Sequence, residues 1–113
     1  MLTKEQILKA GDLKIEKIAV PEWGGDVFIR PLSSRDRDKW EADVSASGKV
    51  SYDNLRAKLV ARSICDESGN LLFDESDIPA LGQKSAAAMQ RLFNRLIDLN
   101  QVSDADVDEI VKN

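Results

Sequence analysis

The sequence contains no histidine and only one cysteine among its 113 residues. Without histidine, the chain lacks the side chain best suited to proton transfer near neutral pH and the commonest protein ligand for metals. A single cysteine cannot form an internal disulfide, so nothing indicates an oxidising compartment. With no histidine to activate it, Cys65 is expected to be a small buried residue at a helix end. These absences argue against an enzyme and against a bound cofactor.

Long apolar runs and an excess of basic residues are also missing. No stretch approaches the roughly 18 apolar residues that suggest a membrane span, and the first residues lack a signal-peptide core. The 16 basic and 20 acidic side chains give a net charge of −4, which argues against nucleic-acid binding. At 42% apolar and 32% charged residues, the composition is that of a globular protein. We therefore expect one non-enzymatic, cytosolic domain that acts through its surface.

The negative charge is concentrated at the C-terminal end. Residues 1–97 carry 15 basic and 15 acidic side chains, whereas residues 98–113 carry five acidic and one basic. The pattern predicts a single domain over residues 1–113 with a possible acidic C-terminal arm at 98–113. This segment is either a solubilising helix or an adaptable arm that engages a partner, since a short helix is marginally stable alone.

The N-terminal third predicts a short helix and a β-hairpin. Thr3 and Gln6 form a capping-box pattern before a helix over about 4–10. Apolar residues then alternate over 13–20, with a change of phase between Ile15 and Ile18 that suggests a bulge. The turn sequence Pro-Glu-Trp-Gly-Gly at 21–25 leads into a second strand over 26–30.

The remainder of the chain has mainly helical patterns. Helices are expected at about 35–46, 52–65, 75–81, 84–99 and 104–111. We therefore predict an α+β fold, a predominantly α-helical single domain with about five or six helices and an N-terminal β-hairpin. The predicted core consists of Ile15, Ile18, Val20, Val27, Ile29, Trp40, Leu55, Leu59, Val60, Ile64, Leu72, Phe73, Leu92, Phe93 and Leu96.

The acidic segment from Asp66 to Asp77 departs from the pattern of a calcium-binding loop at two positions. Its sixth position is Leu71, where an EF-hand loop requires glycine, and its twelfth is Asp77 rather than glutamate. We therefore interpret the segment as a polar turn followed by a capped helix, and we predict no metal site.

Five residues are candidates for partner binding. Trp23 lies on the glycine-containing turn and either packs in the core or contacts a partner. Arg91 and Arg95 follow one side of the long helix and meet either an acidic partner or the nearby acidic residues at 98–113. Val107 and Ile110 belong to a thin apolar stripe on the last expected helix.

Several segments carry a family resemblance. They are Leu-Thr-Lys-Glu-Gln-Ile-Leu at 2–8, Val-Pro-Glu-Trp-Gly-Gly at 20–25 with the strand at 27–30, Asn-Leu-Arg-Ala-Lys-Leu-Val-Ala at 54–61, Cys-Asp-Glu-Ser-Gly-Asn-Leu-Leu-Phe at 65–73, and Leu-Gly-Gln-Lys-Ser-Ala-Ala-Ala at 81–88 leading into Leu-Phe at 92–93. Together they resemble the tail assembly chaperones of long-tailed, siphovirus-type bacteriophages and prophages. The two turn sequences are the most specific parts, and they mark a fold rather than a catalytic site.

The resemblance implies a non-enzymatic assembly factor that binds the tape-measure protein, keeps it soluble and helps recruit subunits of the major tail-tube protein. It also implies a homo-oligomer in the host bacterial cytoplasm that is absent from the mature virion. Many such proteins have a longer product made by ribosomal frameshifting, and this chain would be the short form. The alternative is a virion structural tail component, such as a connector or terminator subunit. A regulatory protein encoded by a prophage is a third option and would bind a host protein instead.

Overall fold

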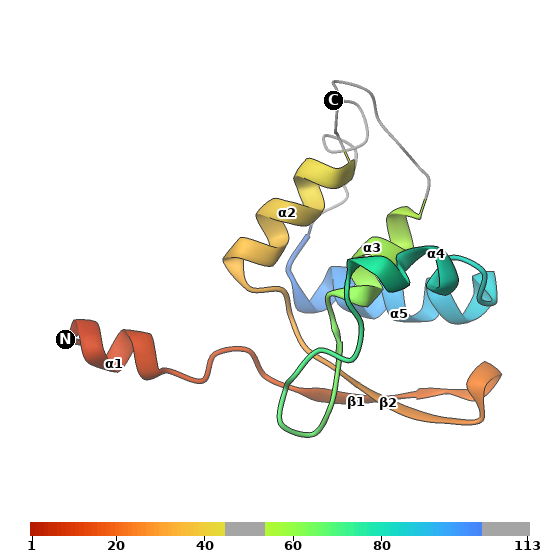
Figure 1. Cartoon of the computed structure of the whole chain (residues 1–113). Coiled ribbons are helices and arrows are strands. Elements are labelled where there is room, and N and C mark those ends of the chain that lie inside the picture. The colour runs from red at the N-terminus through yellow and green to blue at the C-terminus, as the bar shows by residue number, and fades with distance from the viewer. Residues whose placement is uncertain (45–53, 103–113) are drawn as a thin grey trace.

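The computed structural model describes residues 1–44 and 54–102. These residues form an α+β domain with five α-helices and a three-stranded antiparallel sheet (Figure 1). The elements are α1 (Lys4–Lys9), β1 (Glu16–Val20), the 3-10 segment η1 (Pro21–Trp23), β2 (Gly25–Ile29), α2 (Ser34–Val44), α3 (Leu55–Ala61), β3 (Ile64–Cys65), the 3-10 segment η3 (Glu75–Asp77), α4 (Ile78–Leu81) and α5 (Ala86–Leu99). The predicted fold class is confirmed. The helix predicted at 104–111 lies outside the described residues.

The N-terminal hairpin forms as predicted, but without a bulge. β1 and β2 pair in one continuous antiparallel register from Glu16 opposite Ile29 to Val20 opposite Gly25. β1 begins only at Glu16, so Ile15 lies outside the paired strands. The change in alternation between Ile15 and Ile18 therefore requires no bulge.

A third strand replaces the end of a predicted helix. The helix expected over 52–65 ends at Ala61, where the N–H groups of Arg62 and Ser63 donate to carbonyls three residues earlier. The chain then leaves the helix, and Ile64 and Cys65 pair with β2. The expectation that Cys65 ends a helix is therefore wrong, although its burial is confirmed. This pairing gives the sheet the order β1-β2-β3.

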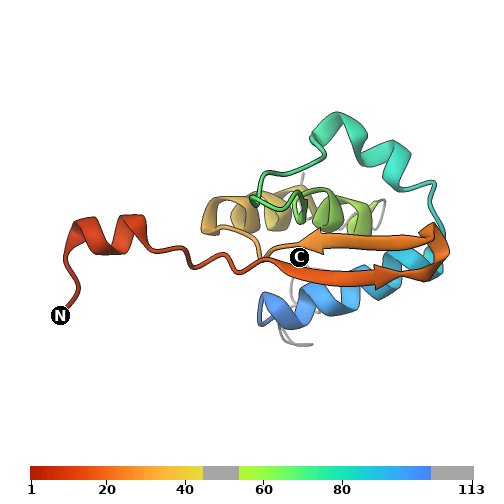
Figure 2. The same ribbon diagram turned by 90° about the horizontal axis from the view of Figure 1, so that it is seen from below.

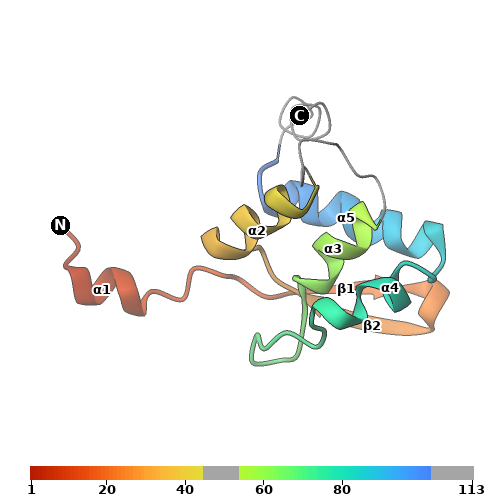
Figure 3. The same ribbon diagram turned by 45° about the horizontal axis from the view of Figure 1, so that its top comes forward.

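One face of the sheet carries the helices. Figures 1 and 3 show α3 and α5 on the same side of the hairpin. Val20 and Ile29 are fully buried on that side, and Ile18 packs against the same core. Lys17 and Asp26 alternate with these residues and form an ion pair of 3.5 Å on the other face. The hairpin is therefore stable only as a layer beneath the helices.

Helix α5 supplies the largest apolar face. Ser85 caps its start, and Met89, Leu92, Phe93 and Leu96 are buried, as their helical spacing predicts. The buried apolar residues of the described chain are Val20, Ile29, Leu32, Trp40, Val44, Ala57, Leu59, Val60, Ala61, Ile64, Cys65, Ile78, Leu81, Ala88, Met89, Leu92, Phe93, Leu96 and Val102.

Most of the predicted core is confirmed, with two errors. Ile18, Val27, Leu55 and Phe73 are only half-buried, but they pack against the core. Ile15 and Leu72 are exposed by 38% and 57%, so placing them in the core was wrong. Leu72 points outward because Leu71 bridges to Cys65 and extended side chains alternate in direction.

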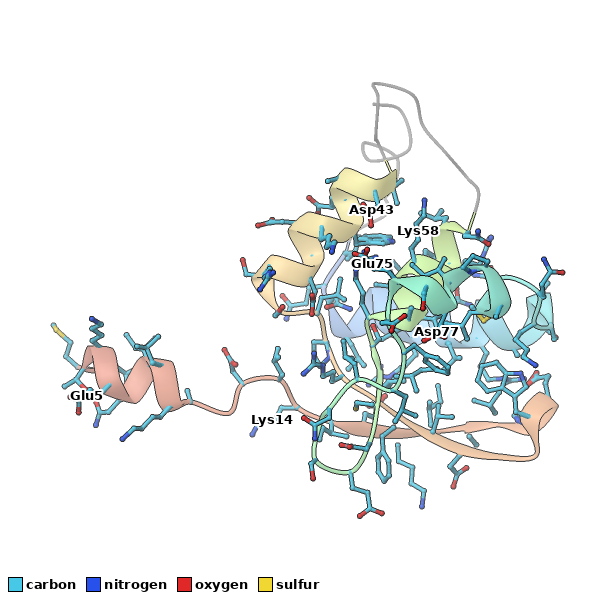
Figure 4. All side chains as sticks on the ribbon, viewed as in Figure 1. Glu5, Lys14, Asp43, Lys58, Glu75 and Asp77 are labelled. Atoms are coloured by element: carbon cyan, nitrogen blue, oxygen red, sulfur yellow. The ribbon has the colours of Figure 1, made fainter. Side chains whose placement is uncertain are left out.

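A buried arginine, Arg62, contacts residues of α2, α3 and η3. Arg62 is only 6% exposed, and its guanidinium donates to Asp43 of α2 at 2.6 Å. It also reaches the Lys58 carbonyl of α3 and, at 3.5 Å, Glu75 of η3. Figure 4 shows Asp43, Lys58 and Glu75 on these neighbouring elements. A buried charge requires such partners, so this cluster fixes α2 against α3.

Candidate functional site

The turn at the end of the hairpin has a conformation set by its sequence. Pro21 begins the 3-10 segment, and the Gly24 N–H donates to the Pro21 carbonyl at 3.1 Å. Gly24 has a φ of 74°, in the left-handed region that glycine adopts without strain. This geometry places Trp23, half-buried, against the core.

Trp23 also forms one wall of a surface cleft of about 470 Å³. The other walls come from segments that are distant in sequence and contribute mostly apolar surface. The lining residues are Trp23, Phe73, Asp77, Ala80, Leu81 and Lys84. The cleft thus lies between the hairpin turn and α4, and Asp77 of this region is visible in Figure 4.

The lining of this cleft is mostly apolar, with one charged side chain of each sign. Its walls include two aromatic rings and the buried Leu81. At the rim, Asp77 already accepts a hydrogen bond from the Asp74 backbone. Lys84 has no ion-pair partner among residues 1–44 and 54–102.

Two ion pairs fix the hairpin on α5, and we call them the clasp. Arg91 donates to the Glu22 carboxylate at 2.8 Å, next to Trp23 in the turn. Arg95 donates two hydrogen bonds to Glu16 at the start of β1. These hydrogen bonds lower the pKa of both glutamates from their ordinary value of 4.5. The clasp therefore holds the turn that carries Trp23, which is one wall of the cleft, although the clasp residues do not line the cleft themselves.

Loss of the clasp should make stability less dependent on pH. A folded-state pKa below the ordinary value stabilises the protein above about pH 4.5, and this contribution disappears as pH falls through the lowered pKa. We expect the double variant Arg91→Gln/Arg95→Gln to unfold a few degrees below the parent at pH 7. The two melting curves should converge once the pH has fallen below the lowered pKa of the glutamates, because both carboxyl groups are then protonated in both proteins.

Circular dichroism melts across this pH range provide the measurement. Arg35→Gln is the matched control, since Arg35 is exposed and has no ion-pair partner within the described chain. A difference in Tm between parent and double variant that stays constant from pH 7 to pH 3 would contradict the role of the glutamates.

The five predicted partner-binding residues have different positions. Trp23 packs against the core, as one interpretation of its sequence expects, and it also lines the cleft. Arg91 and Arg95 meet glutamates of the hairpin, while Asp98 adds a smaller electrostatic contribution at Arg95. Val107 and Ile110 lie outside the described residues. Partner binding by all five stays a prediction.

The sequence did not reveal the rest of the cleft. Phe73 was expected only as a core residue, and Ala80, Leu81 and Lys84 carried no binding signal. One sequence feature marks the region: Asp74 and Asp77 form a capping box that starts the 3-10 segment before Pro79. The α-helix that follows has only four residues, and Ala80 within it is exposed.

The described helices include none that is long and apolar enough to cross a membrane. A family model described as phage tail assembly chaperone matches residues 5–113. The solved structure of the bacteriophage HK97 tail assembly chaperone is similar, with a TM-score of 0.63 over 88% of this chain and 95% of that chain. At 20% identity, that similarity shows a shared fold. No curated protein sequence matches the chain.

Proposed function

Because the chain belongs to the phage tail assembly chaperone family, which is non-enzymatic, we propose that it binds the tape-measure protein of its own phage and keeps it soluble. Several copies bind along this client and help to recruit subunits of the major tail-tube protein around it. The protein acts in the host bacterial cytoplasm and leaves before the virion is complete. In the absence of client, it forms a homo-oligomer.

The cleft beside Trp23 is the observation that carries this proposal. A long helical client repeats apolar side chains every three or four residues, and helix-in-groove recognition uses such side chains as anchors. The apolar walls formed by Trp23, Phe73 and Leu81 fit one anchor at a time. Asp77 and Lys84 at the rim are suited to the charged residues that flank anchors on an amphipathic helix.

The proposal is tested by co-expressing the chain with the tape-measure protein of the same phage. Ala80→Glu places a carboxylate in the cleft at an exposed helical position, and burying it on binding is costly. We expect this variant to bind the client roughly tenfold more weakly or worse, and to lower the soluble fraction of the client. Pull-down and sedimentation of the lysate measure the two effects.

Ala87→Glu is the matched control, because Ala87 is also exposed on a helix but lies outside the cleft. The control should behave as the parent. Equal solubility of the client with and without the chaperone, together with no complex on pull-down, would refute the function. Equal binding by Ala80→Glu and Ala87→Glu would refute the cleft as its site.

The alternative is a virion structural tail component, such as a connector or terminator subunit. Mass spectrometry of purified particles separates the two functions. A structural subunit is present at stoichiometric level, whereas the proposed chaperone is missing from finished particles.

A further inference from the structure

Lys84 carries a charge that the fold does not pair. The residue is exposed in the connection between α4 and α5, which lies beside the hairpin turn (Figures 2 and 3). Its ammonium group forms no ion pair with any of the residues 1–44 and 54–102. Lys84 nevertheless lines the same cleft as Trp23. It is therefore an unpaired cation at the rim of a mostly apolar hollow.

The position of Lys84 is also unfavourable for stability. The next residue, Ser85, is the N-cap of α5, which with 14 residues is the longest of the described helices. The start of a helix carries a partial positive charge, so a cation placed there destabilises the helix. The first turn of α5 lies wholly within the described residues and contains no acidic side chain that would offset this cost. A charge that the fold neither pairs nor favours indicates a functional role.

The carboxylates close to the cleft are held by other contacts. Asp77 accepts the Asp74 N–H at 2.9 Å in the capping box that begins η3. Glu22, in the hairpin turn, accepts a hydrogen bond from Arg91 at 2.8 Å. Neither carboxylate can move to Lys84 without loss of its present contact. The partner of this lysine therefore comes from a ligand of the cleft.

We propose that Lys84 selects the client segment that the cleft binds, by pairing with an acidic side chain within one helical turn of the apolar anchor. On a helix, residues three or four positions apart share a face, so the anchor and the acidic residue reach the cleft together. The apolar walls receive the anchor, and the Lys84 ammonium group receives the carboxylate. This inference rests on the proposed function and adds to it the charge that a client segment carries.

The pair with Lys84 contributes specificity more than affinity. Apolar walls accept any apolar side chain of suitable size, whereas an ammonium group attracts a carboxylate and repels another cation. A client segment with Lys or Arg in place of the acidic residue brings two like charges together at the rim. Lys84 therefore excludes such segments even when their apolar anchors are the same.

Overlapping helical peptides that together cover the tape-measure protein test this selection on the full-length chain. Peptides bound by the wild type should carry Asp or Glu three or four positions from an apolar anchor. Lys84→Glu should bind these peptides about tenfold more weakly and should favour peptides with Lys or Arg at that position. Lys84→Arg keeps the charge and should bind as the wild type does. Fluorescence anisotropy measures the affinities.

Lys84→Gln separates client selection from a structural role. Removing the cation from the start of α5 should raise Tm by about 1–3 °C. The affinity for acidic peptides should fall about threefold to fivefold in the same variant. Added salt should weaken binding by the wild type more than binding by Lys84→Gln, because ions screen the pair that this variant lacks. A purely structural lysine would not give a more stable protein that binds less well.

Lys14→Glu is the matched control for charge reversal. Lys14 is exposed, has no ion-pair partner within the described chain and lies before the start of β1, outside the cleft (Figure 4). This variant has the same net charge as Lys84→Glu, and it should keep the affinity and the peptide preference of the wild type.

The peptide experiment distinguishes this inference from the proposed function. Equal affinity and equal peptide preference of the wild type and Lys84→Glu overturn selection by Lys84, and so does an equal loss of binding by Lys14→Glu. The proposed function survives either result if Ala80→Glu still loses binding. Equal binding by Ala80→Glu and Ala87→Glu refutes the cleft as the client site, and this inference with it.

Discussion

Replacing Leu92 by alanine is expected to lower the free energy of unfolding by about 3–4 kcal/mol. Leu92 is fully buried on the face of α5 that packs against the core. Truncation removes apolar contacts and leaves a cavity that the rigid surrounding helices fill only in part. Urea denaturation followed by circular dichroism gives the change directly, because a domain of this size usually unfolds in two states.

Leu72→Ala is the control for Leu92→Ala. This variant makes the same chemical change at a side chain that is 57% exposed, so the free energy of unfolding should fall by less than about 1 kcal/mol. Similar losses at the two positions would contradict the assignment of Leu92 to the core and Leu72 to the surface.

Replacing Trp40 by alanine is expected to destabilise the fold by about 3–5 kcal/mol. Trp40 is 1% exposed, and its indole N–H donates to the Leu55 carbonyl at 3.4 Å. The ring is the largest buried side chain and the main apolar contact of α2, whose other faces are largely charged. Its removal should loosen α2 as a unit, and differential scanning calorimetry measures the loss.

Trp40→Phe serves as the comparison for this variant. Phenylalanine keeps an aromatic ring in the core and loses only part of the volume and one weak hydrogen bond, so we expect less than half of the loss seen with alanine. A loss below about 1 kcal/mol for Trp40→Ala would show that α2 is held mainly by the Arg62 cluster.

The sequence predicted the elements whose signals are local. The Thr3 and Gln6 capping box, the Pro-Glu-Trp-Gly-Gly turn and the apolar face of α5 each depend on residues within a few positions of one another. The wrong or missing predictions concern residues whose partners are distant in the sequence. Ile64 and Cys65 leave a helical pattern because β2, more than 30 residues earlier, offers backbone partners. Arg62 is buried because Asp43 and Glu75 converge on it from both sides of the chain.

In the candidate site, too, the sequence indicates the residues with local signals and misses those that only the tertiary fold brings together. Trp23 was identifiable because an aromatic ring beside Gly24 in a turn suggests a contact. The cleft was not identifiable, since Phe73 and Leu81 join Trp23 only through the tertiary fold. Arg91 and Arg95 were recognised as an exposed cationic pair, but their hairpin partners lie 69 and 79 positions away in the sequence. Short-range charge patterns do not reveal such partners.

The buried Cys65 is a native probe of local opening at β3. Its thiol lies in β3 at the edge of the sheet, and burial raises its pKa, so it is protonated and shielded in the folded state. Thiol reagents therefore react with the chain only when this edge opens. The rate of labelling at the single native cysteine counts those openings, in free chaperone and in complexes alike, without any change to the sequence.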